Sequence, residues 1–344
     1  MYLNTLYDLL RKNENAYDVF GIGNAIVDLL VFVDDEFVES HQLPKGHMKL
    51  STSEEQAKLL FDLEKFSIHM ASGGSAANTM ISIANIGGKT FFTGKIAKDP
   101  NGEFYRVNLK EAGVEFDVHP IEETEGSTAT CIVLITPDAE RTMSTHLGVS
   151  ILLHENDIQE EIIKKSKMVY IEGYLWLNPI TKQAALKTIE IAKMHQVPVS
   201  FTFSDGFVVA QFREEFEEKI KNHDFDVVFM NADEIQSFFA MEDYQKCLHE
   251  LSKFDNLFFV TNSEKGANVV YKNTIIPVSG FPVKALDTTG AGDYFAGGTL
   301  FGLTRLKTPE QSAKWGNYLA SKVVQVQGAR LDKIYKDEIT KIKV

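Results

Sequence analysis

The residues best suited to chemistry form one short segment, Asp287-Thr-Thr-Gly-Ala-Gly-Asp293, which runs into an apolar stretch. The small residues Gly290, Ala291 and Gly292 leave backbone N–H groups uncovered, and a helix that begins there adds the positive end of its dipole. This pattern predicts an anion site. The carboxylate of Asp293 would repel an anion, so its presence indicates that it faces a hydroxyl that attacks a phosphate. A glycine-rich helix start with Asp293 as a first-turn acid is the alternative.

Composition narrows the classes of protein to which such a site could belong. The 344 residues are 44% hydrophobic, which is enough for a large buried core, and the formal net charge is -13. An acidic balance argues against a nucleic acid or an anionic membrane as partner. The chain has two cysteines and no Cys-x-x-Cys pair, its start is unlike a signal peptide, and it has no apolar run long enough to span a membrane. These features predict a soluble cytoplasmic protein. We expect a small-molecule substrate and a monomer or homodimer.

Strand-like and helix-like runs alternate along most of the chain. Apolar runs rich in β-branched and aromatic residues lie at 19–23, 90–94, 167–172, 198–203, 226–230 and 256–261. Helical stretches lie at 76–86, 180–195, 212–221, 233–239 and 244–254. This alternation is typical of a doubly wound α/β fold, in which helices flank a mostly parallel sheet. We expect that domain to span residues 17–344, after an N-terminal helical extension at 1–16.

Two regions break the alternation, at 29–52 and at 118–147. Each contains apolar runs that look like paired strands without a crossover helix between them. We interpret the two regions together as a small β-sheet lid, inserted in the main domain, over a site at one edge of the main sheet. An antiparallel extension that only covers the sheet edge would leave the same pattern.

The segment 287–293 resembles the C-terminal signature of the ribokinase/PfkB family of carbohydrate and nucleoside kinases. Gly73-Gly74-Ser-Ala-Ala-Asn78 resembles a second signature of that family. The resemblance covers residues 17–330, and in detail it is similar to the adenosine-kinase branch. It implies a ribokinase-like fold with a β lid, and ATP-dependent transfer of the γ-phosphoryl group to a primary hydroxyl, with Asp293 taking the proton.

On the substrate side, the resemblance assigns a ribose-like group to Asn24, Asp28, Gly73, Gly74 and Asn78. A carboxylate at Asp28 can accept hydrogen bonds from both hydroxyls of a vicinal diol. As plainer alternatives, Asp28 could be a turn residue and the glycines could serve close helix packing. A dinucleotide-binding Gly-x-Gly-x-x-Gly loop is disfavoured because Ile26 stands at its third glycine. Tyr174 and Phe207 fall near positions that flank a nucleobase, although core packing is the commoner role of an aromatic ring.

For ATP and Mg²⁺, the resemblance points to Asn231, Glu234, Thr261, Ser263, Gly266 and Thr288. Glu234 would hold Mg²⁺ through water, because this cation prefers oxygen ligands and keeps several waters. A capping box between Asn231 and Glu234 is the structural alternative. Arg141, in the predicted lid, would close over the moving phosphoryl group, unless it is only a surface residue beside Glu140. A monovalent cation such as K⁺ is left open.

The leading hypothesis is therefore ATP-dependent phosphorylation of a purine nucleoside such as adenosine. A kinase of a free sugar, such as ribose or fructose, is the alternative within the same class. A nucleoside or nucleotide sensor without turnover is the alternative from another class, and the intact Asp293 argues against it. A dehydrogenase is the most distant alternative.

Overall fold

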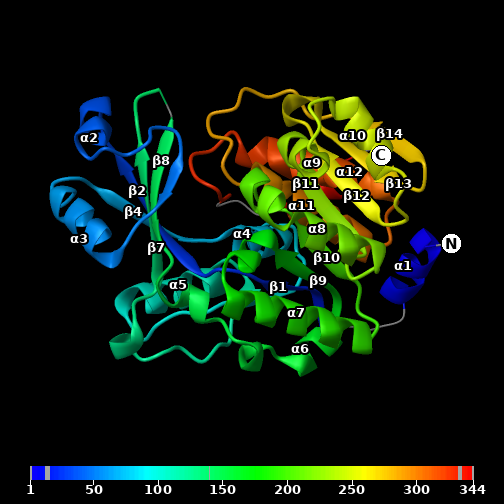
Figure 1. Cartoon of the computed structure of the whole chain (residues 1–344), viewed down its shortest axis with the longest axis horizontal. Helices are drawn as coiled ribbons and strands as arrows, with labels where there is room; N and C mark the ends of the chain where they lie inside the picture. The colour runs from blue at the N-terminus through cyan, green and yellow to red at the C-terminus, as the bar shows by residue number, and fades with distance from the viewer. Residues whose placement is uncertain (1, 12–15, 139, 332–334, 343–344) are drawn as a thin grey trace.

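The computed structural model describes residues 2–11, 16–138, 140–331 and 335–342, and Figure 1 shows how their elements are arranged. The strands are β1 Tyr17–Ile22, β2 Ile26–Phe32, β3 Met48–Leu50, β4 Ile68–Gly73, β5 Thr90–Thr93, β6 Val114–Glu115, β7 Ala129–Ile135, β8 Arg141–His146, β9 Ser166–Glu172, β10 Val199–Thr202, β11 Val227–Asn231, β12 Leu257–Thr261, β13 Ala267–Tyr271 and β14 Thr274–Val278. The α-helices are α1 Tyr2–Arg11, α2 Asp35–Ser40, α3 Ser53–Asp62, α4 Ser75–Ala84, α5 Pro100–Glu111, α6 Glu160–Lys164, α7 Pro179–Met194, α8 Gly206–Lys221, α9 Ala232–Phe239, α10 Tyr244–Leu251, α11 Ala291–Thr304, α12 Pro309–Val323 and α13 Lys336–Ile339.

The larger sheet has nine strands within the described residues, in the order β14-β13-β12-β11-β10-β9-β1-β5-β6. The strands from β12 to β6 pair in parallel, whereas β13 and β14 extend the edge as antiparallel strands. The chain runs from β1 outward to β6 and then returns to β9 on the other side of β1. This change of direction places a topological switch point between β1 and β9, where α/β folds bind ligands. The predicted doubly wound, mostly parallel sheet is confirmed.

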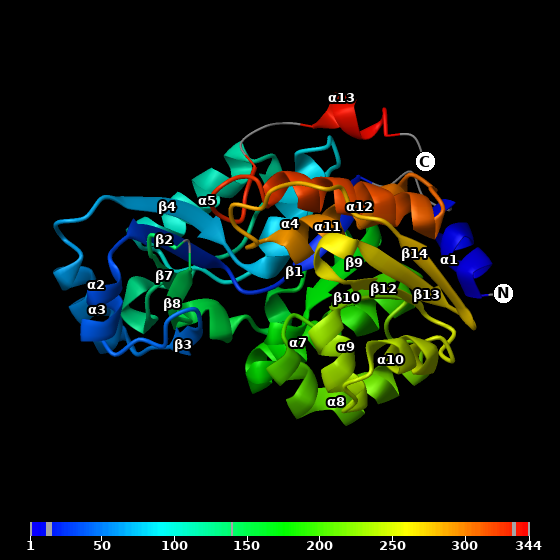
Figure 2. The same cartoon turned by 90° about the horizontal axis from the view of Figure 1, so that it is seen from above.

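Helices cover both faces of this sheet, as Figure 2 shows from above. Alternate residues of a strand enter different hydrophobic cores. In β11, Val227 and Phe229 join the core that contains buried residues of α1, α4, α5, α11 and α12. Val228 and Met230 join the core that contains buried residues of α6 to α10. Burial on both faces explains why these strands read as continuous apolar runs in the sequence.

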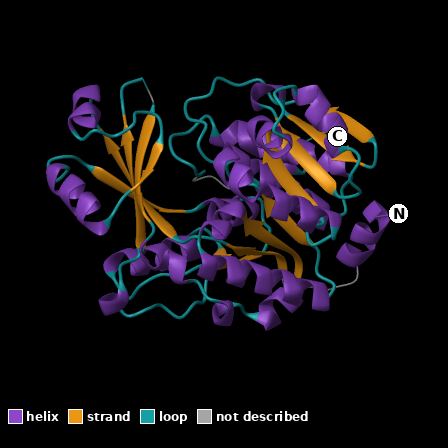
Figure 3. Ribbon diagram, viewed as in Figure 1, coloured by secondary structure: helices purple, strands orange, loops and turns teal. Residues whose placement is uncertain are grey.

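The smaller sheet has the strand order β3-β8-β7-β2-β4 and stands beside the main sheet at one end of the molecule (Figure 3). Strand β2 follows β1 after only three residues, so one stretch of chain links the two sheets. Strand β4, Ile68–Gly73, lies outside the regions 29–52 and 118–147 that were assigned to the lid. The first three residues of β4 are exposed, and its sequence IHMASG lacks regular apolar alternation, so the strand signal was weak.

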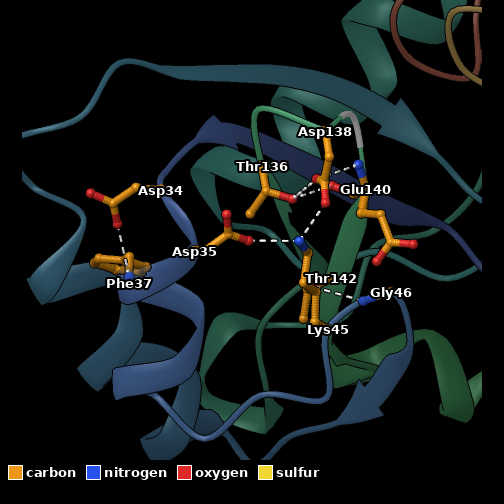
Figure 4. Close-up of polar contacts among 9 residues, drawn as sticks. All are labelled: Asp34, Asp35, Phe37, Lys45, Gly46, Thr136, Asp138, Glu140 and Thr142. Carbon is orange, nitrogen blue, oxygen red and sulfur yellow. Dashed lines mark hydrogen bonds and ion pairs between the residues drawn. The ribbon is translucent and has the colours of Figure 1, made fainter.

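Ion pairs within the smaller sheet tie its loops together. Lys45, just before β3, pairs with Asp35 of α2 at 2.6 Å and with Asp138 of the β7–β8 turn at 2.5 Å (Figure 4). The side chain of Asp138 also accepts a hydrogen bond from the hydroxyl of Thr136 at 2.6 Å. These pairs join segments of the smaller sheet to one another. They do not connect the smaller sheet to the main sheet.

Helix α11 lies at the centre of the helical layer that leads to the site. From Tyr294 to Thr304 every residue is buried, and glycines replace larger side chains where other helices cross. A Cβ at Gly297 would stand 1.6 Å from the hydroxyl oxygen of Ser82 in α4, and one at Gly298 would stand 2.9 Å from Gly316 of α12. The close approach allowed by these glycines places the first turns of α4 and α11 side by side.

The predicted N-terminal helix is confirmed as α1, whose Leu6 and Leu10 are buried against the main domain. Residues 1 and 12–15 of the predicted extension lie outside the described residues. Among the helices that the structure describes, none has the length and apolar character needed to cross a membrane.

Candidate active site

A buried carboxylate, Glu172, organises the switch point at the carboxyl end of β9. Its Oε1 accepts hydrogen bonds from the backbone N–H and the side-chain Nδ2 of Asn24, at 2.7 and 2.9 Å. Its Oε2 accepts a hydrogen bond from the backbone N–H of Ala76 at 2.9 Å. Burial raises the pKa of Glu172 to about 7. This one side chain therefore holds the turn after β1 against the start of α4.

The glycines of the first signature allow close contact between these same segments. Gly74 has φ +97°, and a Cβ there would lie 2.2 Å from the carbonyl oxygen of Asn24. A Cβ at Gly73 would lie 2.4 Å from a carboxylate oxygen of Asp28. Only glycine fits at Gly74, and a side chain at Gly73 would displace the Asp28 carboxylate. The pair thus brings the turn after β1, the second strand and the start of α4 together.

Asp28 is a half-buried carboxylate on β2, at the end of the smaller sheet that adjoins the main domain. Burial raises the pKa of Asp28 to about 6. The positive charges of Arg330 and Arg141 act against this rise, whereas the negative charge of Asp293 adds to it. Residues distant in the sequence therefore share one electrostatic environment.

The segment 287–293 forms the predicted turn into a helix. Gly290 is the N-cap of α11 with φ +77°, and no side chain caps this helix terminus. A Cβ at Gly292 would meet no atom within 4 Å, so the first turn opens onto free space. The first-turn N–H groups of a helix without a side-chain cap are suited to an anion. We call residues 288–292 the anion loop.

Asp293 is held in place by side chains of α4. Its Oδ1 accepts a hydrogen bond from the hydroxyl of Ser75 at 2.6 Å, and its Oδ2 accepts one from Nδ2 of Asn78 at 3.1 Å. Burial raises the pKa of Asp293 to about 6, while these hydrogen bonds and the charge of Arg330 act in the opposite direction. The carboxylate is therefore fixed in position and has a pKa suited to proton transfer near neutral pH.

Arg141 connects the smaller sheet to the anion loop. It lies at the start of β8 and forms an ion pair with Asp287, and both side chains are almost fully buried. Asp287 also accepts hydrogen bonds from the backbone N–H of Thr289, at 3.0 Å, and of Gly328, at 2.7 Å. The alternative of a surface arginine beside Glu140 is wrong, because the guanidinium is buried between the two parts of the molecule.

A cavity of about 260 Å³ joins the anion loop to the carboxyl ends of β10, β11 and β12. Its lining brings together several residues that the sequence analysis assigned to different motifs. These are Tyr174, Asn231, Glu234, Thr261, Thr288, Gly290, Ala291, Gly292 and Asp293. Ser75, Thr202 and Ser204 also line the cavity.

Asn231 and Glu234 form the expected capping box at the start of α9. The Asn231 Oδ1 accepts from the Glu234 N–H at 2.8 Å, and the Glu234 carboxylate accepts from the Asn231 N–H at 2.9 Å and from its Nδ2 at 3.0 Å. Burial raises the pKa of Glu234 to about 7. The structural alternative is therefore present, and Glu234 also lines the cavity. Within the described residues no three His, Cys, Asp or Glu side chains cluster as a metal site.

Several predicted ligand residues lie outside the lining of this cavity: the sugar-side residues Asn24, Asp28, Gly73, Gly74 and Asn78, and also Ser263, Gly266 and Phe207. Ser263 and Gly266 flank the short turn after β12, where a Cβ at Gly266 would lie 2.3 Å from the backbone of the segment 278–280. Phe207 is 46% exposed at the start of α8. Their contacts with ATP and with a nucleobase stay predictions. Gly266 has a packing reason that accounts for it without a ligand.

Ser75, Glu172 and Arg330 were not predicted from the sequence as site residues. Ser75 stands inside the signature 73–78, and Glu172 ends an apolar strand at the edge where ligands bind, so both positions carried a usable signal. Arg330 follows α12 without a motif of its own. Its hydrogen bond to Asn78 joins residues 252 positions apart, and only the folded chain reveals it.

A model of the pfkB family of carbohydrate kinases matches residues 57–334. The chain belongs to this family. It is a phosphotransferase with an alcohol group as acceptor, and membership of the family implies ATP, usually with Mg²⁺. The resemblance read from the two signatures is confirmed.

This pfkB kinase is similar to both nucleoside and sugar kinases. Adenosine kinase 2 of Arabidopsis thaliana is 26% identical over 343 residues, which cover 92% of this chain and 96% of that protein. The crystal structure of adenosine kinase from Sinorhizobium meliloti has 35% identity and a TM-score of 0.87, covering 95% of this chain and 99% of that one. The crystal structure of a probable sugar kinase from Rhizobium etli CFN 42 has 33% identity and a TM-score of 0.88. The match covers 95% of this chain and 98% of that one.

Proposed function

We propose that this kinase transfers the γ-phosphoryl group of ATP to the primary hydroxyl of a purine nucleoside such as adenosine. The observation that carries the proposal is the placement of Asp293. Asp293 lies in the first turn of α11, a helix whose N-terminus has no side-chain cap. Ser75 and Asn78 of α4 fix its carboxylate by hydrogen bonds. A base and a set of anion-binding N–H groups thus converge on one point.

The chemistry follows from this convergence. Asp293 accepts the proton of the attacking hydroxyl, whose oxygen forms a bond to the γ-phosphorus. The bond between that phosphorus and the β–γ bridging oxygen breaks, and ADP leaves with the electron pair. N–H groups of the anion loop, together with Arg141, stabilise the negative charge on the moving group. Asp293 then releases its proton to solvent.

The substrate side of the proposal rests on Asp28 and on its neighbours in the smaller sheet. Asp28 would accept hydrogen bonds from the two ribose hydroxyls, and Asn24, Gly73, Gly74 and Asn78 would contact the same sugar. In the register of the sheet Asp28 pairs with Cys131 and Leu30 with Val133, so apolar side chains share its face. An apolar face beside the diol site favours a substrate with an aromatic base over a free sugar.

The ATP side rests on the lining of the cavity. Glu234 and Asn231 would hold Mg²⁺ through water, and Thr261 and Thr288 would contact the nucleotide, with Ser263 and Gly266 on the adjacent turn. Bound Mg²⁺ would neutralise charge on the phosphate oxygens. The cavity supports this assignment, because Asn231, Glu234 and Thr261 line it together with the anion loop.

Substitution of the proposed base tests the mechanism. Asp293→Asn should keep the fold but lower kcat by roughly 10²–10⁴-fold, because the general base is lost. The measurement is ADP release with adenosine as acceptor. Asp8→Asn, on the exposed face of α1, is the matched control and should retain wild-type turnover. Near-normal turnover of Asp293→Asn would remove Asp293 from the mechanism.

A substrate panel tests the acceptor. With adenosine, inosine, ribose and fructose offered separately to the wild-type enzyme, we expect the highest kcat/KM for a purine nucleoside. The similarity to a probable sugar kinase makes the free sugars the relevant competitors. A higher kcat/KM for ribose or fructose would replace the nucleoside by a sugar.

A further inference from the structure

Arg330 contacts the candidate active site from the turn that follows α12. Its Nε donates a hydrogen bond to Oδ1 of Asn78 at 3.1 Å. Its Nη1 donates to Oδ1 of Asn108 in α5 at 3.0 Å and to the hydroxyl of Ser72 in β4. The guanidinium therefore bridges α4, α5 and the smaller sheet at the level of Asp28 and Asp293.

The position of this turn is itself set by the active site. The backbone N–H of Gly328 donates to Oδ2 of Asp287, the residue before the anion loop, at 2.7 Å. The backbone N–H of Leu331 donates to the hydroxyl of Tyr294, the residue after Asp293, at 2.9 Å. Hydrogen bonds on both sides of Arg330 thus hold it in register with the catalytic segment.

The contact with Asn78 decides which way its amide points. An arginine side chain can only donate hydrogen bonds, so the Asn78 oxygen must face Arg330. The Nδ2 group is then directed to Asp293, to which it donates at 3.1 Å. Arg330, Asn78 and Asp293 form a chain of hydrogen bonds in which the first residue fixes the orientation of the second.

Charge gives Arg330 a second role. The charged groups that act on one another around Asp293 are Asp28 of β2, Glu172 of β9, and the cations Arg330 and Arg141. The buried titratable groups that face Asp293, Asp28 or Arg330 are Tyr170, Tyr174, Tyr105, Cys131 and Tyr294. Arg141 is paired with Asp287. Arg330 forms no ion pair with any described residue, so its charge acts on Asp28 and Asp293 together. Its removal would leave several carboxylates facing one another with a single, already paired cation.

A purely structural arginine explains the site less well. The Nη2 atom of Arg330 is buried and has no hydrogen-bond partner among the described residues. Leaving a charged donor unpaired in a buried place costs free energy. The same burial lowers the pKa of the guanidinium, and the nearby Asp28 and Asp293 counter this effect.

We propose that Arg330 is a positioning residue of this kinase, which orients the Asn78 amide toward Asp293 and supplies the positive charge that lets Asp28 and Asp293 be ionised together. The role rests on the proposed function of Asp293 as the base and of Asp28 as the diol ligand. It extends that function, because neither signature of the family contains Arg330.

The test compares the pH dependence of kcat/KM in variants that separate charge from shape. Arg330→Met and Arg330→Gln remove the charge, and Arg330→Lys keeps it. The matched control is Arg305→Met, which breaks the two-fold ion pair with Asp18, 2.6 and 2.9 Å, far from the anion loop. Kinetics are measured by ADP release with ATP and adenosine, and thermal unfolding reports the fold.

The expected result is a shift of the acid limb of the profile. In the neutral variants the limb should move to higher pH by about one unit, the usual effect of a lost opposite charge nearby. The activity loss should then be on the order of tenfold larger below the limb than well above it. Arg330→Lys should keep the wild-type limb. Arg305→Met should lower the unfolding temperature without moving the limb.

Two results would overturn the inference. One is a folded Arg330→Met or Arg330→Gln enzyme with the wild-type profile. The other is an equal shift in Arg330→Lys, which would exclude charge as the cause. If Arg330→Met does not fold, the pH profiles of Arg330→Gln and Arg330→Lys still show whether the charge of residue 330 sets the acid limb. If the wild-type enzyme phosphorylates ribose or fructose in place of adenosine, the proposed nucleoside is wrong, and profiles with that sugar decide the role of Arg330 separately.

Discussion

Asp293 sits where its charged form is disfavoured, and this has a consequence for stability. Its pKa of about 6 lies above the ordinary value of 3.8, and the cause is burial. Folding therefore favours the protonated acid. The resulting contribution to stability is fully present below the unfolded pKa, near pH 4, and is lost as pH rises through about 6. Above that range an ionised Asp293 costs stability that its function as a base requires.

The neutral variant Asp293→Asn should therefore be more stable than the wild type at alkaline pH. We expect a gain of about 1–3 kcal/mol in the free energy of unfolding at about pH 8, which shrinks as pH falls toward about 4. Urea unfolding at both pH values measures it, and Asp8→Asn is the exposed control. An equal gain at both pH values would assign the effect to packing, and a loss at high pH would contradict the argument.

The sequence was sufficient to predict those residues whose role depends on their immediate neighbours in the chain. The anion loop and Asp293 lie within the seven consecutive residues 287–293, and Gly74 stands next to the helix that it starts. The partners of these residues were out of reach, because they meet only in the folded chain. Ser75 and Asp293 are 218 positions apart, and Asn24 and Glu172 are 148 apart. Glu172 stands at the end of an apolar strand, which is a weak signal, whereas nothing around Arg330 distinguishes it from an ordinary structural charge.

At the level of elements, the central strands were predictable because both of their faces are buried. Each expected strand from 19–23 to 256–261 has a counterpart in the main sheet. The smaller sheet was harder to predict, since it has an exposed edge at β4 and a three-residue strand at β3. The burial of α11 on all sides follows from its run of apolar and glycine residues, but its two neighbours, α4 and α12, become known only from the structure.

The spacing between α4 and α11 should control activity, because the two helices carry Asn78 and Asp293. Gly297→Ala would place a methyl group 1.6 Å from the Ser82 hydroxyl oxygen and force the helices apart. We expect a loss of about 1–3 kcal/mol in unfolding free energy and a fall in kcat of up to about 10²-fold from misplacement of the base.

Gly206→Ala is the matched control for that substitution. Its Cβ would meet only the Ser237 side chain, at 4.0 Å. This variant should retain activity and stability, which are followed by ADP release and urea unfolding. If Gly297→Ala behaved like Gly206→Ala, the α4–α11 spacing would not limit catalysis.

At the scale of the whole molecule, the active site lies between two sheets that one chain segment links directly. Asp28 comes from the smaller sheet, Asp293 from the main domain, and neither part holds a complete site. Arg141 forms an ion pair across this division, because it extends from β8 to Asp287 beside the anion loop. We propose that the smaller sheet acts as a lid, and that its closure brings the Arg141 cation to the place where phosphate charge develops.

Two cations of the smaller sheet separate this role from simple stabilisation of the lid. Arg141→Met removes the cation that reaches the anion loop, so kcat should fall by about 10²–10³-fold, the usual cost of losing one stabilising donor. Lys45→Met breaks pairs with Asp35 and Asp138 that stay within the smaller sheet (Figure 4). These pairs are largely exposed and screened by solvent, so they contribute little to stability, and kcat and KM should change little. Steady-state kinetics of both variants decide between the two roles. A similar, small effect of both substitutions would mean that Arg141 only holds the lid and takes no part in phosphoryl transfer.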